Sequence, residues 1–201
     1  MGRRRTIRLW ELLVGFAVIA AGIAAVSLIP SLRDALWLNP DRDAAAPAPS
    51  TGSDVAVSRP DDAFALTVQY VYDGDTIRAV VEEPNAVVPG RDPVRIRLIG
   101  IDTPEGTPTV ECWAEEARDH LRALLPEGST VWAAADRDPR DRYERALLYL
   151  WTDDGTFINH ELVAAGDAEA IRVGRNDAHF VLLSAAEQRA REAGLGQWGS
   201  C

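Results

Sequence analysis

Two short acidic clusters carry the side chains best suited to chemistry. Residues 73–76 read DGDT and residues 102–105 read DTPE, and each cluster follows an apolar run. Carboxylates that a fold brings together repel one another, and a hard divalent cation with oxygen ligands relieves that repulsion. The pattern therefore indicates a metal-dependent hydrolytic site in which one carboxylate remains for proton transfer.

Each part of this pattern also has a simpler explanation. Asp73-Gly74 is typical of a hairpin turn, and residues 102–105 are typical of a helix start with an acidic first turn. Arg97 on a strand and Arg145 in a charged loop are ordinarily solvated surface residues. The joint occurrence of all four features favours a site.

The charge of the chain limits how it could bind a polyanion. The 201 residues have a formal net charge of −10; the first 40 carry five arginines and two acids, so the remainder is close to −13. Non-specific binding to nucleic acid depends on basic groups that displace counterions. Any nucleic-acid substrate must therefore be held by a few local arginines and a metal.

The N-terminal 62 residues are expected to lie outside the globular domain. Four arginines precede an uncharged run at residues 12–29, which predicts a transmembrane anchor in segment 1–30 with a cytoplasmic N-terminus. A cleaved signal peptide or a buried core helix are the alternatives. Residues 31–62, rich in proline and alanine, are expected to form a flexible linker, and residues 63–201 the domain.

Hydrophobic patterning within the domain predicts short strands followed by helices. The expected strands are 65–72, 77–81, 94–101, 130–135, 146–151 and 168–173, and the expected helices are 112–125, 157–165 and 178–193. This order indicates a mainly β protein with helices (α+β), and a five-stranded OB-fold barrel with about three helices suits it best.

Five segments in this order resemble the staphylococcal nuclease (thermonuclease) family. They are residues 73–76 (DGDT), 97–105 (RLIGIDTPE), 141–145 (DRYER), the region 158–166 and a closing Trp198. The resemblance covers about residues 65–198. It implies a five-stranded barrel and a calcium-dependent phosphodiesterase that cuts DNA and RNA and leaves 3′-phosphates.

The resemblance also implies a role for each matching residue. Asp75 and Asp102 would be calcium carboxylates, the Thr103 backbone carbonyl would be a further ligand, and Asp73 would support them without binding directly. Calcium suits such flexible, all-oxygen coordination better than magnesium does.

Three further residues would act on the substrate according to the resemblance. Glu105 would position or deprotonate the attacking water, and Arg97 and Arg145 would grip the phosphate. Permanently charged guanidinium groups are well suited to the negative charge that builds on phosphate oxygens during attack.

The sequence departs from the family in two places. Glu144 stands where the family has a glycine, so a different turn is expected beside Arg145. The family's substrate-binding tyrosines are missing, because residues 170–175 read AIRVGR. Arg172 or Arg175 would contact phosphate in their place.

The cysteines and histidines are interpreted structurally. Cys112 and Cys201 are expected to form a disulfide if the domain lies outside the cytoplasm, and two free thiols are the alternative. The three histidines have no metal-ligand spacing and are expected to be surface or packing residues.

The sequence thus predicts a monomeric, membrane-tethered, extracytoplasmic calcium-dependent nuclease, or a secreted one if the N-terminal segment is cleaved. A catalytically inactive nucleic-acid-binding OB-fold module is the principal alternative. A calcium-dependent structural or adhesion module is a third hypothesis.

Overall fold

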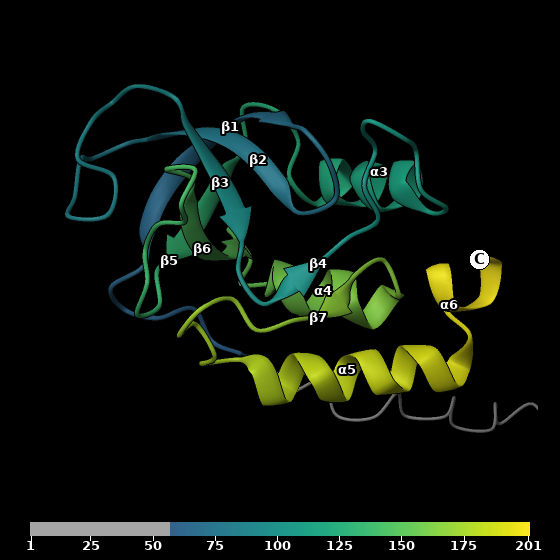
Figure 1. Ribbon diagram of the computed structural model, residues 1–201. Coiled ribbons are helices and arrows are strands. Elements are labelled where there is room, and N and C mark those ends of the chain that lie inside the picture. Colours follow the sequence, from purple (N-terminus) through teal and green to yellow (C-terminus); the bar gives the residue numbers. More distant parts are fainter. Residues whose placement is uncertain (1–56) are drawn as a thin grey trace, which may run out of the picture. The chain divides into compact units, whose positions relative to one another are not determined.

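The computed structural model describes residues 57–201 (Figure 1). The predicted anchor and most of the predicted linker lie outside these residues. Within residues 57–201, no helix is both long enough and apolar enough to span a bilayer.

The described part of the chain is built on a closed five-stranded barrel, as predicted (Figure 1). Its strands are β1 (Phe64–Val71), β2 (Thr76–Val81), β3 (Val94–Leu98), β5 (Thr130–Ala134) and β6 (Ala146–Thr152). They close in the order β1-β2-β3-β6-β5, with β3 and β6 parallel and the other pairs antiparallel. This is an α+β architecture consistent with an OB-fold.

Alternating side chains fill the barrel. Leu66, Val68 and Ile77 point inward and are buried, whereas Arg78 in β2 is exposed. Strand β6 does not alternate, because all its residues except the last are buried. Helix α4 (Ile158–Ala165) packs against β6, so both faces of this strand are covered.

Three helices accompany the barrel within residues 57–201, in agreement with the predicted number. They are α3 (Ala114–Leu124), α4 and α5 (Phe180–Ala193). A single turn, α6 (Gln197–Ser200), was not predicted. Figure 1 shows α4 between the barrel and α5, so α4 and α5 extend the core away from the barrel.

A short two-stranded sheet positions the second acidic cluster. Strand β4 (Ile101–Asp102) pairs antiparallel with β7 (Glu169–Ala170), and Asp102 lies opposite Glu169. The strand expected at 168–173 is therefore only two residues long. After β7, one further backbone bond, from Ile171 N–H to the Gly100 carbonyl, continues the contact.

A disulfide joins Cys112 to Cys201 across 89 residues of sequence. It connects the segment before α3 to the last residue of the chain. The predicted pairing is thus present in the structure, and the two-thiol alternative is wrong.

Candidate active site

Asp75 is the last residue of a tight turn and directly precedes β2. Its backbone carbonyl accepts a hydrogen bond from Leu98 N–H at 2.9 Å, which ties the turn to the end of β3. Only 5% of Asp75 is exposed. A carboxylate at this depth requires a charged or hydrogen-bonded partner.

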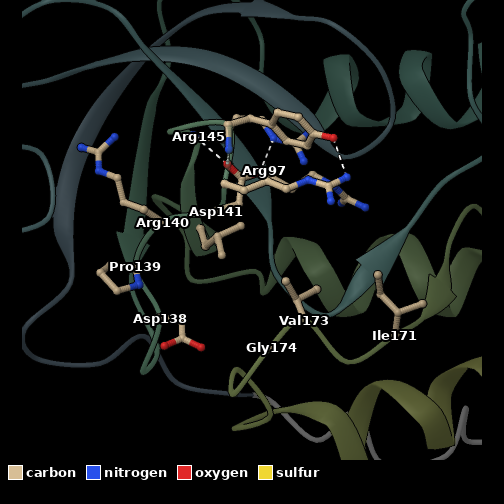
Figure 2. Close-up of a pocket in the computed structure, with 12 residues that line it drawn as sticks. Arg97, Asp138, Pro139, Arg140, Asp141, Arg145, Ile171, Val173 and Gly174 are labelled. Carbon is tan, nitrogen blue, oxygen red and sulfur yellow. Dashed lines mark hydrogen bonds and ion pairs between the residues drawn. The ribbon is translucent and has the colours of Figure 1, made fainter.

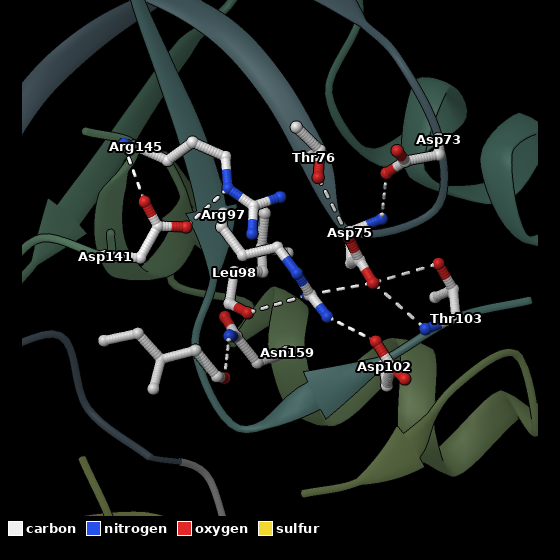
Figure 3. A network of polar contacts seen from close by, with 11 residues as sticks. Asp73, Asp75, Thr76, Arg97, Leu98, Asp102, Thr103, Asp141, Arg145 and Asn159 are labelled. Carbon is white, nitrogen blue, oxygen red and sulfur yellow. Dashed lines mark hydrogen bonds and ion pairs between the residues drawn. The ribbon is translucent and has the colours of Figure 1, made fainter. Parts of the chain in front are cut away.

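Arg97 is that partner, and it contacts both predicted metal carboxylates (Figure 3). Its Nη1 atom lies 2.8 Å from Asp75 Oδ2, and its Nη2 atom lies 2.5 Å from Asp102 Oδ1. Asp75 is buried, whereas the Asp102 side chain is 55% exposed. A single guanidinium therefore bridges the two acidic clusters, which are far apart in the sequence.

Thr103 fixes the orientation of Asp75. Its backbone N–H and its hydroxyl donate to Asp75 Oδ2 at 3.0 and 3.2 Å, while Thr76 donates to Oδ1 at 3.0 Å. Both carboxylate oxygens are thus hydrogen-bonded, and the bonds from residue 103 link the DGDT turn directly to the DTPE segment (Figure 3).

Gly74 allows this close approach. A Cβ atom at this position would lie 2.8 Å from the Thr103 side chain and 2.9 Å from the Ala117 side chain of α3. The sequence pattern explained this glycine as a turn residue only. The structure shows that its small size is what lets the turn pack beneath Thr103 and against α3.

The acidic groups affect one another's protonation. Burial raises the pKa of Asp75 to about 7; the Arg97 charge opposes this rise and the Asp73 charge adds to it. The pKa of Glu105 is also raised, by burial and by the charges of Asp73 and Asp102. Burial is therefore the main cause of both shifts, and the neighbouring carboxylates add to it.

Five of the six predicted site residues line one pocket of about 570 Å³, which is called the acidic pocket below. They are Asp75, Arg97, Asp102, Glu105 and Arg145. The sixth, Thr103, contacts this group through its bonds to Asp75. The structure thus brings all the predicted residues together.

Arg145 reaches this pocket from the loop between β5 and β6. Its Nε atom donates to Asp141 Oδ2 at 2.6 Å, and its backbone N–H donates to Oδ1 of the same residue (Figure 3). Burial alone would raise the pKa of Asp141, but the bonds from Arg145 and Tyr143 outweigh it and lower the pKa. Neighbouring Glu144 adopts φ 63°, the left-handed region in which glycine carries no steric penalty.

Comparison with known proteins identifies the family of this chain. The family model described as "Staphylococcal nuclease homologue" matches residues 95–200. The chain belongs to the staphylococcal nuclease family. A thermonuclease from Staphylococcus intermedius is 35% identical over 135 residues, which is 65% of this chain and 74% of that protein.

Two other relatives are similar over nearly the same share of the chain. A protein described as an uncharacterized endonuclease of Escherichia coli O157:H7 is 33% identical over 128 residues, 64% of this chain and 72% of that protein. The endonuclease YhcR of Bacillus subtilis (strain 168) is 28% identical over 141 residues, 65% of this chain and 11% of that much longer protein.

Asn159, in a segment that matches the family pattern, holds the backbone near the site through two hydrogen bonds. The residue is completely buried. Its amide nitrogen donates to the Ile99 carbonyl at 2.8 Å, and its amide oxygen accepts from Leu150 N–H at 3.0 Å. Asn159 therefore connects α4 and β6 to the turn that leads into Asp102.

The region where the family tyrosines are missing forms part of a second pocket of about 560 Å³ (Figure 2). Ile171 and Val173 line it, together with Arg97 and Arg145. Neither Arg172 nor Arg175 is among the residues that line this pocket or the acidic one.

These two arginines have other contacts. The Arg172 guanidinium lies 4.3 Å from the Phe180 ring centroid. Arg175 binds Asp138 through Nε and Nη2 at 2.9 and 2.5 Å. The structure therefore gives no support to the hypothesis that either residue contacts phosphate.

The acidic pocket also contains residues that the sequence did not assign to the site. Tyr70, Tyr72 and Arg95 line it, as does Arg118 from α3, whose Nε atom is buried without a hydrogen-bond partner. The alternation in β3 placed Arg95 on the same face as Arg97. The other three had no sequence signal, because their positions depend on a strand register and a helix docking that only the fold defines.

Proposed function

We propose that this domain is a calcium-dependent phosphodiesterase that hydrolyses DNA or RNA and leaves 3′-phosphates. The arrangement of Arg97 between Asp75 and Asp102, in one pocket with Glu105 and Arg145, is the observation that supports it. The names of the relatives support the reaction class, since they include thermonucleases and endonucleases.

The donor atoms at the site fit calcium. Within residues 57–201, no group of three or more His, Cys, Asp or Glu side chains is placed to hold a metal. The proposed set is different, because it combines two carboxylates, Asp75 and Asp102, with the Thr103 carbonyl. All of these donors are oxygens, as calcium prefers, and Asp73 and Glu105 add two more carboxylates to the lining of the same pocket. When bound, the ion would polarise the phosphate and neutralise charge that develops on its oxygens.

The protein's own residues account for the remaining chemistry. Glu105 would take a proton from a water molecule whose oxygen attacks phosphorus, and the bond from phosphorus to the 5′-oxygen would break in the same step. The 5′-oxygen would leave as a hydroxyl after it takes a proton from solvent. Arg97 and Arg145 would hold the non-bridging oxygens, where negative charge increases in the transition state.

We also propose that the domain, residues 63–201, acts as a monomer outside the cytoplasm. It would be tethered by the apolar segment in residues 1–30 through the linker at 31–62, or secreted if that segment is cleaved. The disulfide between Cys112 and Cys201 supports this compartment, because such bonds persist in oxidising surroundings.

A cleavage assay tests the proposed reaction. The full chain, purified in detergent, is incubated with end-labelled single-stranded DNA and RNA, with calcium or with a chelator. The proposal predicts calcium-dependent cutting with 3′-phosphate ends. Glu105→Gln should reduce the rate at least about a hundredfold, on the scale of a lost transition-state contact. Exposed Glu127 provides a matched control, and Glu127→Gln should cut like the wild type.

The other hypotheses predict different results. Binding of oligonucleotides without cutting would support the inactive OB-fold module. Calcium binding with neither cutting nor nucleic-acid binding would support the structural module.

A further inference from the structure

A strip of tyrosines and arginines crosses three strands beside the acidic pocket. It consists of Tyr70, Tyr72, Arg78 and Arg95, and is called the β1–β3 strip below. Tyr70 is 40% exposed, Arg78 and Arg95 are exposed, and Tyr72 is half-buried. Tyr70, Arg78 and Arg95 belong to β1, β2 and β3, which lie side by side on one face of the barrel in Figure 1, and Tyr72 directly follows β1.

The strand register places the strip in line with the catalytic arginine. Tyr70 pairs with Arg78, and Arg78 pairs with Arg95, so these three form one row across β1, β2 and β3. In the next row, Thr76 pairs with Arg97. Arg95 and Arg97 are two residues apart on one strand, a separation of roughly 7 Å, so the two rows are adjacent.

An irregularity in β1 turns both tyrosines outward. The register with β2 shifts between Val68 and Tyr70, which leaves one extra residue in β1. Val68 and Val71 are both buried, although an uninterrupted alternation would place them on opposite faces. As a result, Tyr70 and Tyr72 both lie on the outer face, and both line the acidic pocket with Arg95.

The arginines of the strip are not neutralised by acids. Arg122, Arg137, Arg175 and Arg191 each form an ion pair with a carboxylate. In the described part of the chain, no ion pair involves Arg78 or Arg95. Their guanidinium groups lie over tyrosine rings instead, with Arg95 4.5 Å from the Tyr72 centroid and Arg78 5.9 Å from the Tyr70 centroid.

This combination matches the chemistry of one class of ligand. Bases that are not paired stack on aromatic rings and on guanidinium planes, and arginines without acidic partners bind the phosphates between them. The rings of Tyr70 and Tyr72 meet edge to face at 5.0 Å, so they present two differently oriented surfaces rather than one. Bases within a duplex are already stacked on their neighbours and could not use them.

We propose that the β1–β3 strip binds the nucleotides of a single-stranded nucleic acid next to the bond that is cut. The proposal rests on the proposed nuclease function for the location of that bond. It assigns Tyr70 and Tyr72 to base stacking and Arg78 and Arg95 to phosphate binding. The strip would thereby make single strands the preferred substrate of an acidic protein that lacks long-range attraction for polyanions.

Oligonucleotide binding by the full chain tests the proposal. The measurement uses a Glu105→Gln background with calcium, in which cutting should be at least about a hundredfold slower. Fluorescence anisotropy measures the affinity for a dinucleotide, an octanucleotide and an eight-base-pair duplex. The octanucleotide should bind more tightly than the dinucleotide and the duplex. Tyr72→Leu should weaken octanucleotide binding about five- to a hundredfold and remove most of the affinity difference between the octanucleotide and the dinucleotide. Tyr72→Phe keeps an aromatic ring and should retain this difference in affinity.

The charge of the strip has its own readout. Arg95→Gln should reduce the slope of log affinity against log salt by about 0.7, the value for one phosphate contact on a single strand. Arg122→Gln removes the same charge from an exposed position on α3 and is the matched control. It should change the slope much less.

Failure of this inference differs from failure of the proposed function. The strip is not a binding site if the wild type cuts with calcium and the two variants bind like their background. In that case Tyr72→Leu keeps the higher affinity for the longer oligonucleotide, and Arg95→Gln keeps the slope of log affinity against log salt. Equal binding of single strand and duplex would also overturn the stacking role. If the strip variants lose affinity but the wild type never cuts, the inference stands and the nuclease proposal fails.

Discussion

The Nη1 atom of Arg97 lies 2.8 Å from Oδ2 of Asp75, and both side chains are almost completely buried. The Arg97 guanidinium is therefore a structural counter-ion for Asp75 as well as a proposed contact for the substrate phosphate. Because the buried carboxylate depends on this charge, loss of Arg97 should affect folding and chemistry together.

A double-mutant cycle separates the two effects. Arg97→Gln should lower the free energy of unfolding by about 3 kcal/mol in the presence of chelator, because it leaves Asp75 buried without its partner. Arg97→Gln combined with Asp75→Asn should be more stable than Arg97→Gln alone, since the unpaired charge is then gone. Urea denaturation measures the wild type, the two single variants Arg97→Gln and Asp75→Asn, and the double variant. A double variant whose loss is the sum of the single losses would show that the pair is not coupled.

Glu144 offers a position where substitution should improve the protein. Glu144→Gly should raise the free energy of unfolding by about 0.5 to 1 kcal/mol, because glycine adopts the left-handed backbone without the steric penalty. It should also lower KM for an oligonucleotide, because a negative charge beside Arg145 is removed.

Glu144→Ala is the control for these two causes. Alanine removes the charge but keeps the backbone penalty, so only KM should fall. A glycine variant that is less stable than the wild type would contradict the strain interpretation.

Asn159 should be a strong determinant of stability. Asn159→Ala leaves the Leu150 N–H and the Ile99 carbonyl buried without partners, which should cost about 3 kcal/mol. Half-buried Asn85 is a matched control, because its side-chain oxygen also accepts two backbone bonds, from Val87 and Val88. Water can replace those bonds, so Asn85→Ala should cost about 1 kcal/mol. Equal losses in thermal or urea denaturation would disprove the buried-bond explanation.

The pair of His120 and Asp167 predicts a pH dependence of stability. The ring Nδ1 lies 2.5 Å from Asp167 Oδ2, and this hydrogen bond raises the pKa of His120 above 6.5. A raised pKa in the folded state means that the contribution is fully present below pH 6.5 and is lost as the pH rises through the folded pKa.

His120→Gln should therefore be less stable than the wild type by about 1 to 2 kcal/mol near pH 5, and the difference should shrink by about pH 9. Denaturation curves across this range measure the difference. A gap that widens with rising pH would show that the pair does not act through the protonated imidazole.

The sequence predicted most of the barrel from runs of β-branched and aromatic residues and, in β3, from alternation. Arg95 and Arg97 flank the inward-facing Ile96, and this pattern identified β3 directly. The length of β7 was overestimated. The apolar residues Ile171 and Val173 continue the strand pattern in the sequence, but in the structure they lie beyond the strand and line a pocket.

The residue types in the sequence suggested the site, but the contacts between these residues could not be predicted from the sequence. The salt bridges from Arg97 to Asp75 and Asp102 depend on how the end of β3 meets the two acidic segments. The outward position of Tyr70 depends on the register shift in β1. Both are properties of tertiary packing and have no local sequence signal.

Asp102 allows the most direct test of the account, because its side chain is 55% exposed and Asp102→Asn should fold. The measurement is a calcium titration of the full chain, followed by both isothermal calorimetry and oligonucleotide cleavage. The account predicts that binding and cleavage reach half-saturation at the same calcium concentration in the wild type, and that Asp102→Asn weakens both by at least about tenfold. Cleavage that proceeds unchanged in Asp102→Asn, or in the presence of chelator, would contradict it.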